Sequence, residues 1–298
     1  MSKIHYSSCP VCGSFNINPI ITVKDYSISQ EEFVLWQCGN CTLRFTQDAP
    51  DEQSMGTYYQ SSDYISHSNT SKGFLNKLYK KVRNYTLEQK SKLVINYTVP
   101  QGKLLDLGAG IGAFLNTMKE KGWKVQGIEP DAGARKQALE LYKLNLDRTV
   151  LLNELPSDNF DAITLWHVLE HIHDLHTYVE QMKNALQRNG KIFIAVPNYE
   201  SLDASVFKLY WAAYDVPRHL YHFTPKAMQV LMEKHALKII NKLPMWFDSF
   251  YISLLSSRYK NGKTDLLSAG ITGLRSNLKA FSDTKYCSSI IYVVKKDQ

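Results

Sequence analysis

The sequence lacks several features that would place it in a membrane or outside the cell. It has no run of about 18 consecutive apolar residues, so we predict no membrane-spanning helix and no membrane insertion. Its first ten residues, MSKIHYSSCP, contain no apolar segment of the kind that directs secretion, so we expect a cytoplasmic protein. The chain has no internal repeat. Its formal net charge of +7 over 298 residues is moderate and does not by itself select a function.

Cysteine is also scarce, and four of the five cysteines form two C-x-x-C pairs, CPVC and CGNC. In a chain without a secretion signal, this spacing favours a metal over disulfides. Two such pairs supply a closed tetrahedral shell of four thiolates, which is typical of a structural zinc site. We therefore predict one structural Zn²⁺ held by Cys9, Cys12, Cys38 and Cys41. The alternative is a set of four free thiols.

The order of strand-like and helix-like segments divides the chain into three parts. Residues 1–48 form the four-cysteine module, and residues 49–98 form a connector and a helical segment. Residues 72–92 carry seven Lys or Arg against one acid, which fits either a solvated helix face or a patch for a phosphorylated substrate. Residues 99–298 alternate between strands and helices, with a lid insertion at about 198–224. This alternation predicts an α/β fold with a doubly wound, mainly parallel, seven-stranded sheet. We expect its strands at 103–108, 123–130, 149–153, 160–166, 191–198, 238–243 and 288–296. Among its helices we expect one capped by Asp131, one capped by Asp174 and ending at Gly190, and one with Pro225 at its start.

The segment LLDLGAGIGAFL, residues 104–115, reads as a strand, a glycine-rich turn and a helix. Gly108 and Gly110 allow a sharp turn and a close approach to a ligand. The letters also fit a loose dinucleotide fingerprint, but Asp106 would repel a pyrophosphate. A carboxylate there would instead attract the ammonium and sulfonium of S-adenosylmethionine. Glu129, 19 positions after Gly110, is placed to accept hydrogen bonds from ribose hydroxyls. A domain that binds no nucleotide is the alternative.

Taken together, LLDLGAGIGAFL, GIEP, FDAITLWHVLEHIHD and GKIFIAVPN resemble class I S-adenosylmethionine-dependent methyltransferases. The resemblance covers about residues 100–297 and implies a Rossmann-like methyltransferase fold. It assigns S-adenosylmethionine binding to Asp106, Gly108, Gly110 and Glu129. It also implies that Trp166 and His167, after the fourth strand, contact the cofactor. The segment VLLNELP lacks the Asp that often contacts adenine, so we assign no residue to that role.

The motif H-x-x-E-H, at His167, Glu170 and His171, is shared with one class of zinc peptidase. A peptidase carries this motif inside a long helix. Here it follows a buried strand directly, so we predict a short turn above the cofactor site. His171 is expected to face the methyl-transfer cavity. The alternative is that one or both of His167 and His171 are packed and hold the turn by hydrogen bonds.

The segment YWAAYDVPRHLYHFTP, residues 210–225, is dense in aromatic and titratable side chains. It resembles a D-x-P-x-H-L-x-x-F element in a subset of these enzymes with a four-cysteine zinc module, a layout also seen in sugar C-methyltransferases. That likeness makes His219 the first candidate for a general base and His171 the second. The connector residues Tyr59 and Tyr64 resemble tyrosines of that subset that reach the site. The residues predicted to contact substrate are Tyr64, Tyr199, Tyr214, Asp215, Arg218 and His222.

The leading hypothesis is methyl transfer from S-adenosylmethionine to a small-molecule acceptor, such as a sugar, a nucleotide-sugar or a lipid-pathway intermediate. The alternative is an RNA-directed methyltransferase or RNA-binding module that uses the zinc ribbon and the basic helix. Against nucleic acid as a partner, no N-P-P-[YF] motif follows the fourth strand, where WHVL stands. A third hypothesis is a catalytically silent fold whose module docks a partner. The sequence assigns neither the acceptor atom nor the oligomeric state.

Overall fold

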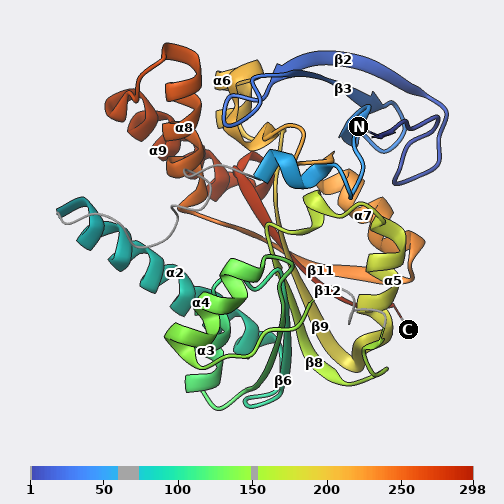
Figure 1. The fold of residues 1–298 in the computed structure, drawn as a ribbon, viewed down its shortest axis with the longest axis vertical. Helices are drawn as coiled ribbons and strands as arrows, with labels where there is room; N and C mark the ends of the chain where they lie inside the picture. The colour runs from blue at the N-terminus through green and yellow to red at the C-terminus, as the bar shows by residue number, and fades with distance from the viewer. Residues whose placement is uncertain (1, 60–73, 149–153, 298) are drawn as a thin grey trace.

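The computed structural model describes residues 2–59, 74–148 and 154–297, and the side chains of 74–80 are outside the description. Its centre is a six-stranded sheet in the order β11-β12-β9-β8-β6-β7 (Figure 1). Strands β7, β6, β8 and β9 run parallel, and β12 and β11 complete the sheet in antiparallel fashion. The strand bounds are β6 Lys103–Leu107, β7 Lys124–Ile128, β8 Phe160–Trp166, β9 Leu186–Pro197, β11 Leu237–Pro244 and β12 Ser289–Lys296.

Helices cover both faces of this sheet (Figure 1). One side carries α2 (Phe74–Tyr97), α3 (Ala113–Glu120) and α4 (Ala132–Tyr142), and the other carries α5 (Leu175–Ala185) and α7 (Pro225–Lys234). Three helices start where the sequence predicts, because Asp131, Asp174 and Thr224 each accept a hydrogen bond from a first-turn backbone N–H. The predicted fold class, a doubly wound and mainly parallel sheet, is thereby confirmed.

The four-cysteine module lies at one end of the sheet, at the top of Figure 1. Its sheet has the order β10-β4-β3-β2, built from β2 (Ile17–Lys24), β3 (Glu32–Cys38) and β4 (Arg44–Thr46). The fourth strand, β10 (Tyr221–His222), comes from the predicted lid and pairs with β4. A short pair, β1 (Lys3–Ile4) with β5 (Ala49–Pro50), and the 3-10 helix η1 (Met55–Tyr59) complete this part. The module and the lid therefore share one sheet.

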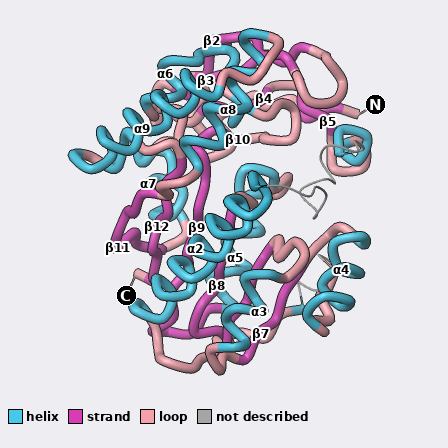
Figure 2. The backbone as a smooth tube through the Cα atoms, turned by 90° about the vertical axis from the view of Figure 1, so that its left-hand side faces the viewer, coloured by secondary structure: helices cyan, strands magenta, loops and turns pink. Residues whose placement is uncertain are grey.

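The lid region also contains α6 (Leu202–Phe207) and two 3-10 helices, η4 (Lys208–Tyr210) and η5 (Ala212–Tyr214). Between β11 and β12 the chain forms a helical hairpin, α8 (Asp248–Asn261) and α9 (Leu266–Ser282), followed by η6 (Thr284–Tyr286). Neither helix is predicted from the sequence. Figure 2 shows that α8 and α9 lie with α6 and the module at the same end of the molecule.

Two further predictions differ from the structure or fall outside it. We predicted a helix from 174 to a stop at Gly190, but α5 ends at Ala185 and β9 begins at the buried Leu186. The role of Gly190 is a close approach, because a Cβ there would lie 2.9 Å from the carbonyl oxygen of Phe160 in β8. The strand predicted at 149–153 lies outside the described residues, next to an isolated parallel bridge from Ile128 to Asp147.

Candidate cofactor and acceptor site

The glycine turn lies between β6 and α3, at the carboxyl end of the parallel strands. Gly108 and Gly110 adopt positive φ angles of 66° and 55°, a region that L side chains rarely occupy. A Cβ on Gly108 would lie 2.5 Å from Val168, so this position needs glycine for space as well. No atom lies within 4 Å of a Cβ built on Gly110. The turn therefore presents open space beside its backbone, where a ligand can approach.

Glu129 follows β7 and reaches back to this turn. Its carboxylate accepts hydrogen bonds from the backbone N–H of Gly110, at 2.7 Å, and of Asp131, at 2.9 Å. Burial raises the pKa of Glu129 above its ordinary value, although these two N–H groups lower it. Each carboxylate oxygen keeps a second lone pair, so the arrangement orients Glu129 and leaves it able to accept ribose hydroxyls.

Asp106 is almost fully buried at the end of β6, where the Thr164 hydroxyl donates to its Oδ1 at 2.6 Å. Burial raises the pKa of Asp106 to about 7, although Thr164 and the ammonium of Lys90 lower it. The Lys90 Nζ lies 4.4 Å from the ring centroid of Trp166, whose ring packs edge-on against Phe114. Among the described residues, the buried Trp166 Nε1 has no hydrogen-bond partner. An open turn, a buried carboxylate and an unpaired indole N–H fit a cationic nucleoside such as S-adenosylmethionine.

His167 follows β8 and lies between two acids. Its Nδ1 is 3.3 Å from Glu170 Oε1, and its Nε2 is 3.0 Å from Asp248 Oδ2. Burial lowers its pKa, but Asp248 and Glu170 outweigh that effect and raise it to about 10. Glu170 is fully buried in the 3-10 turn η3 (Leu169–His171), and the surrounding histidines hold its pKa below the ordinary value against the effect of burial. The motif H-x-x-E-H is thus a charged pair in a short turn, as predicted, rather than part of a long helix.

His171 and His219 face each other, with ring centroids 4.6 Å apart. His219 Nδ1 lies 2.9 Å from the carbonyl oxygen of Ala213, and His171 Nδ1 lies 3.0 Å from that of Arg218. Because a carbonyl oxygen only accepts, each Nδ1 carries the hydrogen in the neutral ring, and each Nε2 keeps its lone pair. Burial, and then the neighbouring His219, lower the pKa of His171 to about 4. His171 is therefore a weak base.

A cavity of about 560 Å³ opens beside these two histidines. Among the predicted site residues, it is lined by His167, His171, Asp215 and His219. In the remaining wall, η5 belongs to the predicted lid, whereas the β2–β3 turn of the module and α8 were not predicted from the sequence. Its polar and aromatic members include Tyr26, Ser27, Asp248, Tyr251, Arg258 and Tyr259. These residues come from segments far apart in sequence, and no local motif marks them.

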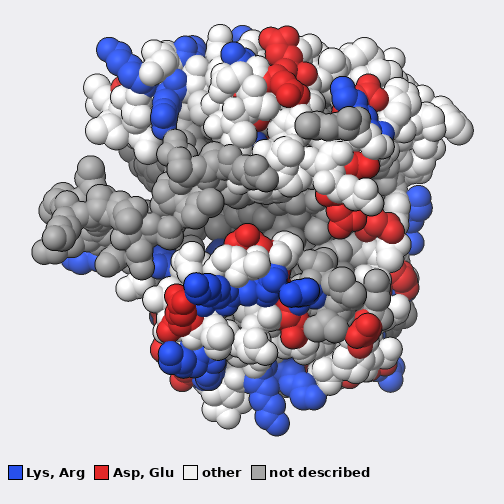
Figure 3. Space-filling model, viewed as in Figure 1, with Lys and Arg blue, Asp and Glu red and all other residues white. Residues whose placement is uncertain are grey.

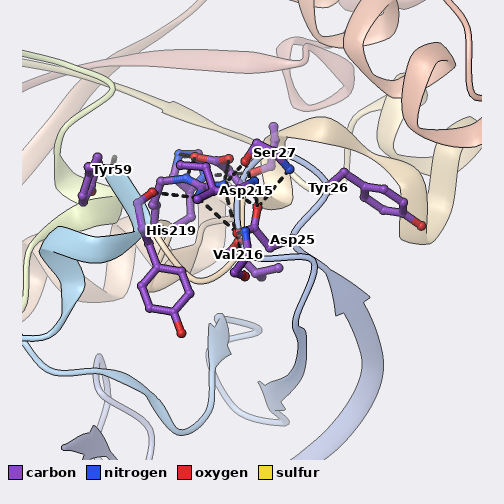
Figure 4. Close-up of polar contacts among 12 residues, drawn as sticks. Asp25, Tyr26, Ser27, Tyr59, Asp215, Val216 and His219 are labelled. Atoms are coloured by element: carbon purple, nitrogen blue, oxygen red, sulfur yellow. Dashed lines mark hydrogen bonds and ion pairs between the residues drawn. The ribbon is translucent and has the colours of Figure 1, made fainter. Parts of the chain in front are cut away.

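Arg218 lies beneath the cavity wall, and its guanidinium is only 1% exposed. It forms ion pairs with Asp25, at 3.0 Å, and with Asp215, at 2.7 Å. Figure 4 shows these two acids beside Ser27. It also donates to the carbonyl oxygen of Tyr58 and to the hydroxyl of Ser27. Burial opposes the ionised form of both acids, but Arg218 holds the pKa of Asp25 and of Asp215 below the ordinary value. Arg218 therefore joins the module to the lid, and its predicted substrate contact stays a prediction.

Three other predicted substrate residues also lie against the module. Tyr199 donates to the carbonyl oxygen of Thr42, and the Arg44 guanidinium lies 3.9 Å from its ring centroid. Arg44 donates to the hydroxyl of Tyr214 at 2.8 Å. His222 is buried in β10, 5.2 Å from the Tyr214 ring. Within the described residues none of the three lines the 560 Å³ cavity, and their substrate contacts stay predictions. Tyr64 lies outside the described residues, and Tyr59 lies 3.1 Å from His171 Nδ1.

The four predicted metal ligands lie together. The sulfur of Cys9 is 3.5 Å from that of Cys41, and the sulfur of Cys12 is 3.5 Å from that of Cys38. All four sulfurs lie within 4.8 Å of one another. Among the described residues one other group, Glu170, His171 and His219, is equally close. Of the helices described, none has the length and the apolar character needed to cross a bilayer.

Comparisons with known proteins agree with this geometry. The sequence profile of a family described as a methyltransferase domain matches residues 75–242, more than half of the chain. The ubiquinone biosynthesis O-methyltransferase of Pelagibacter ubique is 32% identical over 121 residues, which cover 38% of this chain and 48% of that enzyme. The mitochondrial ubiquinone biosynthesis O-methyltransferase of Bos taurus is 26% identical over 164 residues, covering 50% of this chain and 44% of that one. The chain thus spans about half the length of these curated relatives.

Solved structures resemble the fold over a larger share of the chain. Magnesium protoporphyrin IX methyltransferase from Synechocystis, with bound S-adenosylhomocysteine, superposes with a TM-score of 0.54 at 12% identity, covering 83% of this chain and 100% of that one. The 1,6-didemethyltoxoflavin-N1-methyltransferase of Burkholderia thailandensis gives 0.51 at 13% identity, covering 94% of this chain and 100% of that one. These likenesses concern the fold alone. The domain match over residues 75–242 establishes that the chain belongs to the class I S-adenosylmethionine-dependent methyltransferase family, and the fold and the glycine turn agree with it.

Proposed function

We propose that this protein transfers a methyl group from S-adenosylmethionine to a small molecule bound in the 560 Å³ cavity, with His219 as general base. One observation carries the base assignment. The Ala213 carbonyl fixes the hydrogen of His219 on Nδ1, so its basic Nε2 is free to accept a proton at the cavity wall. Methyl transfer needs in-line positioning and, for many acceptors, removal of a proton. The site supports both needs.

In this proposal the residues around the glycine turn hold the cofactor, which supplies an electrophilic methyl group when bound. Glu129, already oriented by Gly110 and Asp131, accepts the ribose hydroxyls. Asp106 provides negative charge toward the amino-acid end, and Trp166 and His167 line the opposite side. The unpaired Trp166 N–H and the open space at Gly110 support this placement.

The lid residues would handle the acceptor proton. His219 Nε2 takes the proton from the acceptor hydroxyl, amine or activated carbon. Asp215 Oδ2, 3.9 Å from that nitrogen, then stabilises the imidazolium. His171 remains neutral because its pKa is lowered to about 4, so it orients the acceptor or accepts a hydrogen bond. The order of the two candidates, His219 before His171, is therefore kept.

The acceptor is proposed to be a small molecule, such as a sugar, a nucleotide-sugar or a lipid-pathway intermediate. The matched relatives are named for O-methylation in ubiquinone biosynthesis, which fits a small acceptor. The cavity wall offers Tyr26 and Tyr259, stacked 4.9 Å apart, and the cation of Arg258. The RNA-directed alternative depends on the basic helix, part of which lies outside the described residues. The predicted cytoplasmic location and the division into three parts stay predictions.

We also propose that Cys9, Cys12, Cys38 and Cys41 hold one structural Zn²⁺. Tetrahedral Zn–S bonds of about 2.3 Å place sulfurs about 3.8 Å apart, close to the 3.5 Å of the two shortest pairs. The backbone N–H of Asn40 points at the Cys38 sulfur at 3.4 Å, which stabilises a thiolate. Four sulfurs leave no open position, so the metal would hold the module together rather than take part in catalysis.

The base assignment is tested by comparing His219→Asn with His171→Asn. We expect His219→Asn to bind S-adenosylhomocysteine like the parent protein in calorimetry. Its transfer of label from methyl-labelled S-adenosylmethionine to a small-molecule cell extract should fall by about 10²–10⁴-fold. The control is His173→Asn, in the same segment but outside the cavity lining. Undiminished transfer in His219→Asn would reject the base role, and a loss confined to His171→Asn would move it there.

A further inference from the structure

The α8–α9 hairpin has its apolar character on the outside. The side chains that α9 buries are small or polar: Ala269, Thr272, Gly273, Ser276 and Ala280. Its large apolar side chains are exposed, with Leu267 and Phe281 each 75% exposed and Leu274 53% exposed. A helix on the surface of a globular protein usually has the opposite arrangement, with its apolar stripe against the core. The folded chain therefore leaves this stripe without a cover among the described residues.

The contact between the two helices also depends on small residues. On α8 the buried set includes Ser249, Ser253, Ser256 and Ser257. A Cβ on Gly273 would lie 3.0 Å from the Cα of Phe250, and the Ser249 hydroxyl donates to the carbonyl oxygen of Gly273 at 3.2 Å. Close packing through small residues, with hydroxyl hydrogen bonds between helices, is the mode that helices use in lipid. α9 therefore packs against α8 without burying its own large apolar side chains.

The exposed residues of α9 form one continuous stripe. Five of them alternate in steps of four and three positions, which places them along one side of the helix. The stripe, including the adjacent Leu266, consists of Leu266, Leu267, Ile271, Leu274, Leu278 and Phe281. At the start of α8, Phe247, Phe250 and Tyr251 are also exposed. Because no described helix meets the requirements of a membrane span, this stripe is suited to lie on an apolar boundary rather than to cross one.

Positive charge surrounds the stripe. Over the α8–α9 part at the upper left of Figure 3, Lys and Arg side chains lie among uncharged ones. The exposed cations of this hairpin outside the cavity lining are Lys260, Lys263, Arg275 and Lys279. The nearby acids are engaged, because Asp265 caps α9 and Asp283 pairs with Lys285 at 3.2 Å. A second copy of the chain would bring the same cations together. An anionic lipid surface instead complements both the stripe and its charge.

We propose that the α8–α9 hairpin docks this protein onto the surface of an anionic membrane. The leucine stripe enters the boundary between headgroups and acyl chains, and the flanking cations contact lipid phosphates. Ile252, Leu255 and Tyr259 of the same α8 line the 560 Å³ cavity. A docked molecule therefore holds its acceptor cavity within about one helix diameter, about 10 Å, of the membrane.

The test is flotation of the full-length protein with lipid vesicles. We expect binding to vesicles of mixed phosphatidylcholine and phosphatidylglycerol, and much weaker binding to phosphatidylcholine alone. Replacing two stripe residues, Leu274→Ser with Leu278→Ser, should lower binding by about tenfold or more. Replacing Arg275→Gln with Lys279→Gln should lower it by about tenfold at low salt and less at high salt.

A matched control is available on α4. Leu139 and Leu141 are 51% and 50% exposed, much like the stripe, so Leu139→Ser with Leu141→Ser should leave vesicle binding unchanged. Calorimetry with S-adenosylhomocysteine shows that each variant is folded. Absence of flotation with either vesicle, or equal losses in the α4 control, would overturn the proposal. So would light scattering that shows a dimer which the stripe variants convert to a monomer, because the face would then join two copies.

Discussion

Two regions of the molecule bury carboxylates in opposite ways. Where the module meets the lid, Asp25 and Asp215 flank one guanidinium, that of Arg218, and both acids have lowered pKa values. At the glycine turn, Asp106 and Glu129 are buried beside hydroxyl and N–H donors, and both have raised pKa values. The ammonium of Lys90 lies over Trp166 and only partly offsets the effect of burial on the Asp106 pKa.

We infer from this difference that the module–lid interface stabilises the fold and that the glycine turn binds the cofactor. A fully paired buried charge is strongly stabilised only while its partner is present. A buried carboxylate without a full partner destabilises the free protein, and a cationic ligand relieves that cost. We therefore expect substitutions at the module–lid interface to lower stability. Removing the charge of Asp106 beside the glycine turn should instead raise the stability of the free protein and lower its affinity for the cofactor.

The largest expected effect comes from the metal ligands on the interface side. Cys9→Ser should release the zinc and unfold the module, because structural zinc supplies about 10–16 kcal/mol in small domains. Asp25 would then no longer be held against Arg218. Metal analysis should find about one zinc per chain in the parent and in Cys287→Ser, whose cysteine is buried elsewhere. Replacing His167 and His171 together should leave the zinc in place. Release in that double variant but not in Cys9→Ser would assign the metal to the histidines.

The next largest effect is expected at Arg218, the cation that pairs with both Asp25 and Asp215. Arg218→Ala leaves Asp25 and Asp215 buried and unpaired, so the free energy of unfolding should fall by about 3–5 kcal/mol in denaturant titrations. Because Arg218 holds the Asp25 pKa below its unfolded value, the stabilisation is present above about pH 4 and is lost as the pH falls further. The difference between the parent and Arg218→Ala should shrink in acid. If the difference in free energy of unfolding stayed the same in acid, or if Arg188→Ala, at an exposed arginine, lost as much stability, this explanation would be contradicted.

The smallest expected effect is an increase, rather than a decrease, in the free energy of unfolding. Asp106→Asn keeps a hydrogen-bond acceptor for Thr164 but removes the buried charge, so the free protein should gain about 1–3 kcal/mol at pH 8. The Asp106 pKa is raised by folding, so the gain should be absent below about pH 4 and grow until about pH 7. Thermal unfolding of Asp158→Asn, at an exposed carboxylate, is the control. Lower stability together with unchanged cofactor affinity would mean that Asp106 serves the fold alone.

The same comparison explains what could be predicted from sequence. The glycine turn, Glu129 and their strands are encoded within about 25 consecutive residues, and the periodicity and the spacing of Gly110 and Glu129 predict them. The helix caps at Asp131 and Asp174 can also be predicted, because each side chain bonds a backbone N–H only three residues later in the sequence. The six described strands of the central sheet overlap the predicted ranges, although β9 begins at Leu186, before its predicted start at 191. Buried strands of this kind are short apolar runs between turn residues.

The wall of the acceptor cavity and the module–lid interface beside it could not be predicted in this way. Asp25 and Arg218 are separated by 193 positions, and only the folded chain shows that they pair. The α8–α9 hairpin was missed although the apolar residues of α9 recur in helical steps of four and three positions, so the signal for this helix was present in the sequence. Arg218, Tyr199 and Tyr214 are predicted to contact substrate because they are polar or aromatic residues of the lid. In the structure their side chains contact the module. The local sequence indicates that such side chains make polar contacts, but it does not identify the distant residues that they contact.

The strand that the lid contributes to the module has a consequence for synthesis of the chain. β4 leaves the ribosome early, yet its partner β10 follows about 176 residues later. At about 5–20 residues per second, one edge of the module sheet stays unpaired for roughly 9–35 s. An unpaired edge can pair with another nascent chain. Early capture of zinc by the cysteines would order the module during this interval, so the metal would matter most before the polypeptide is complete.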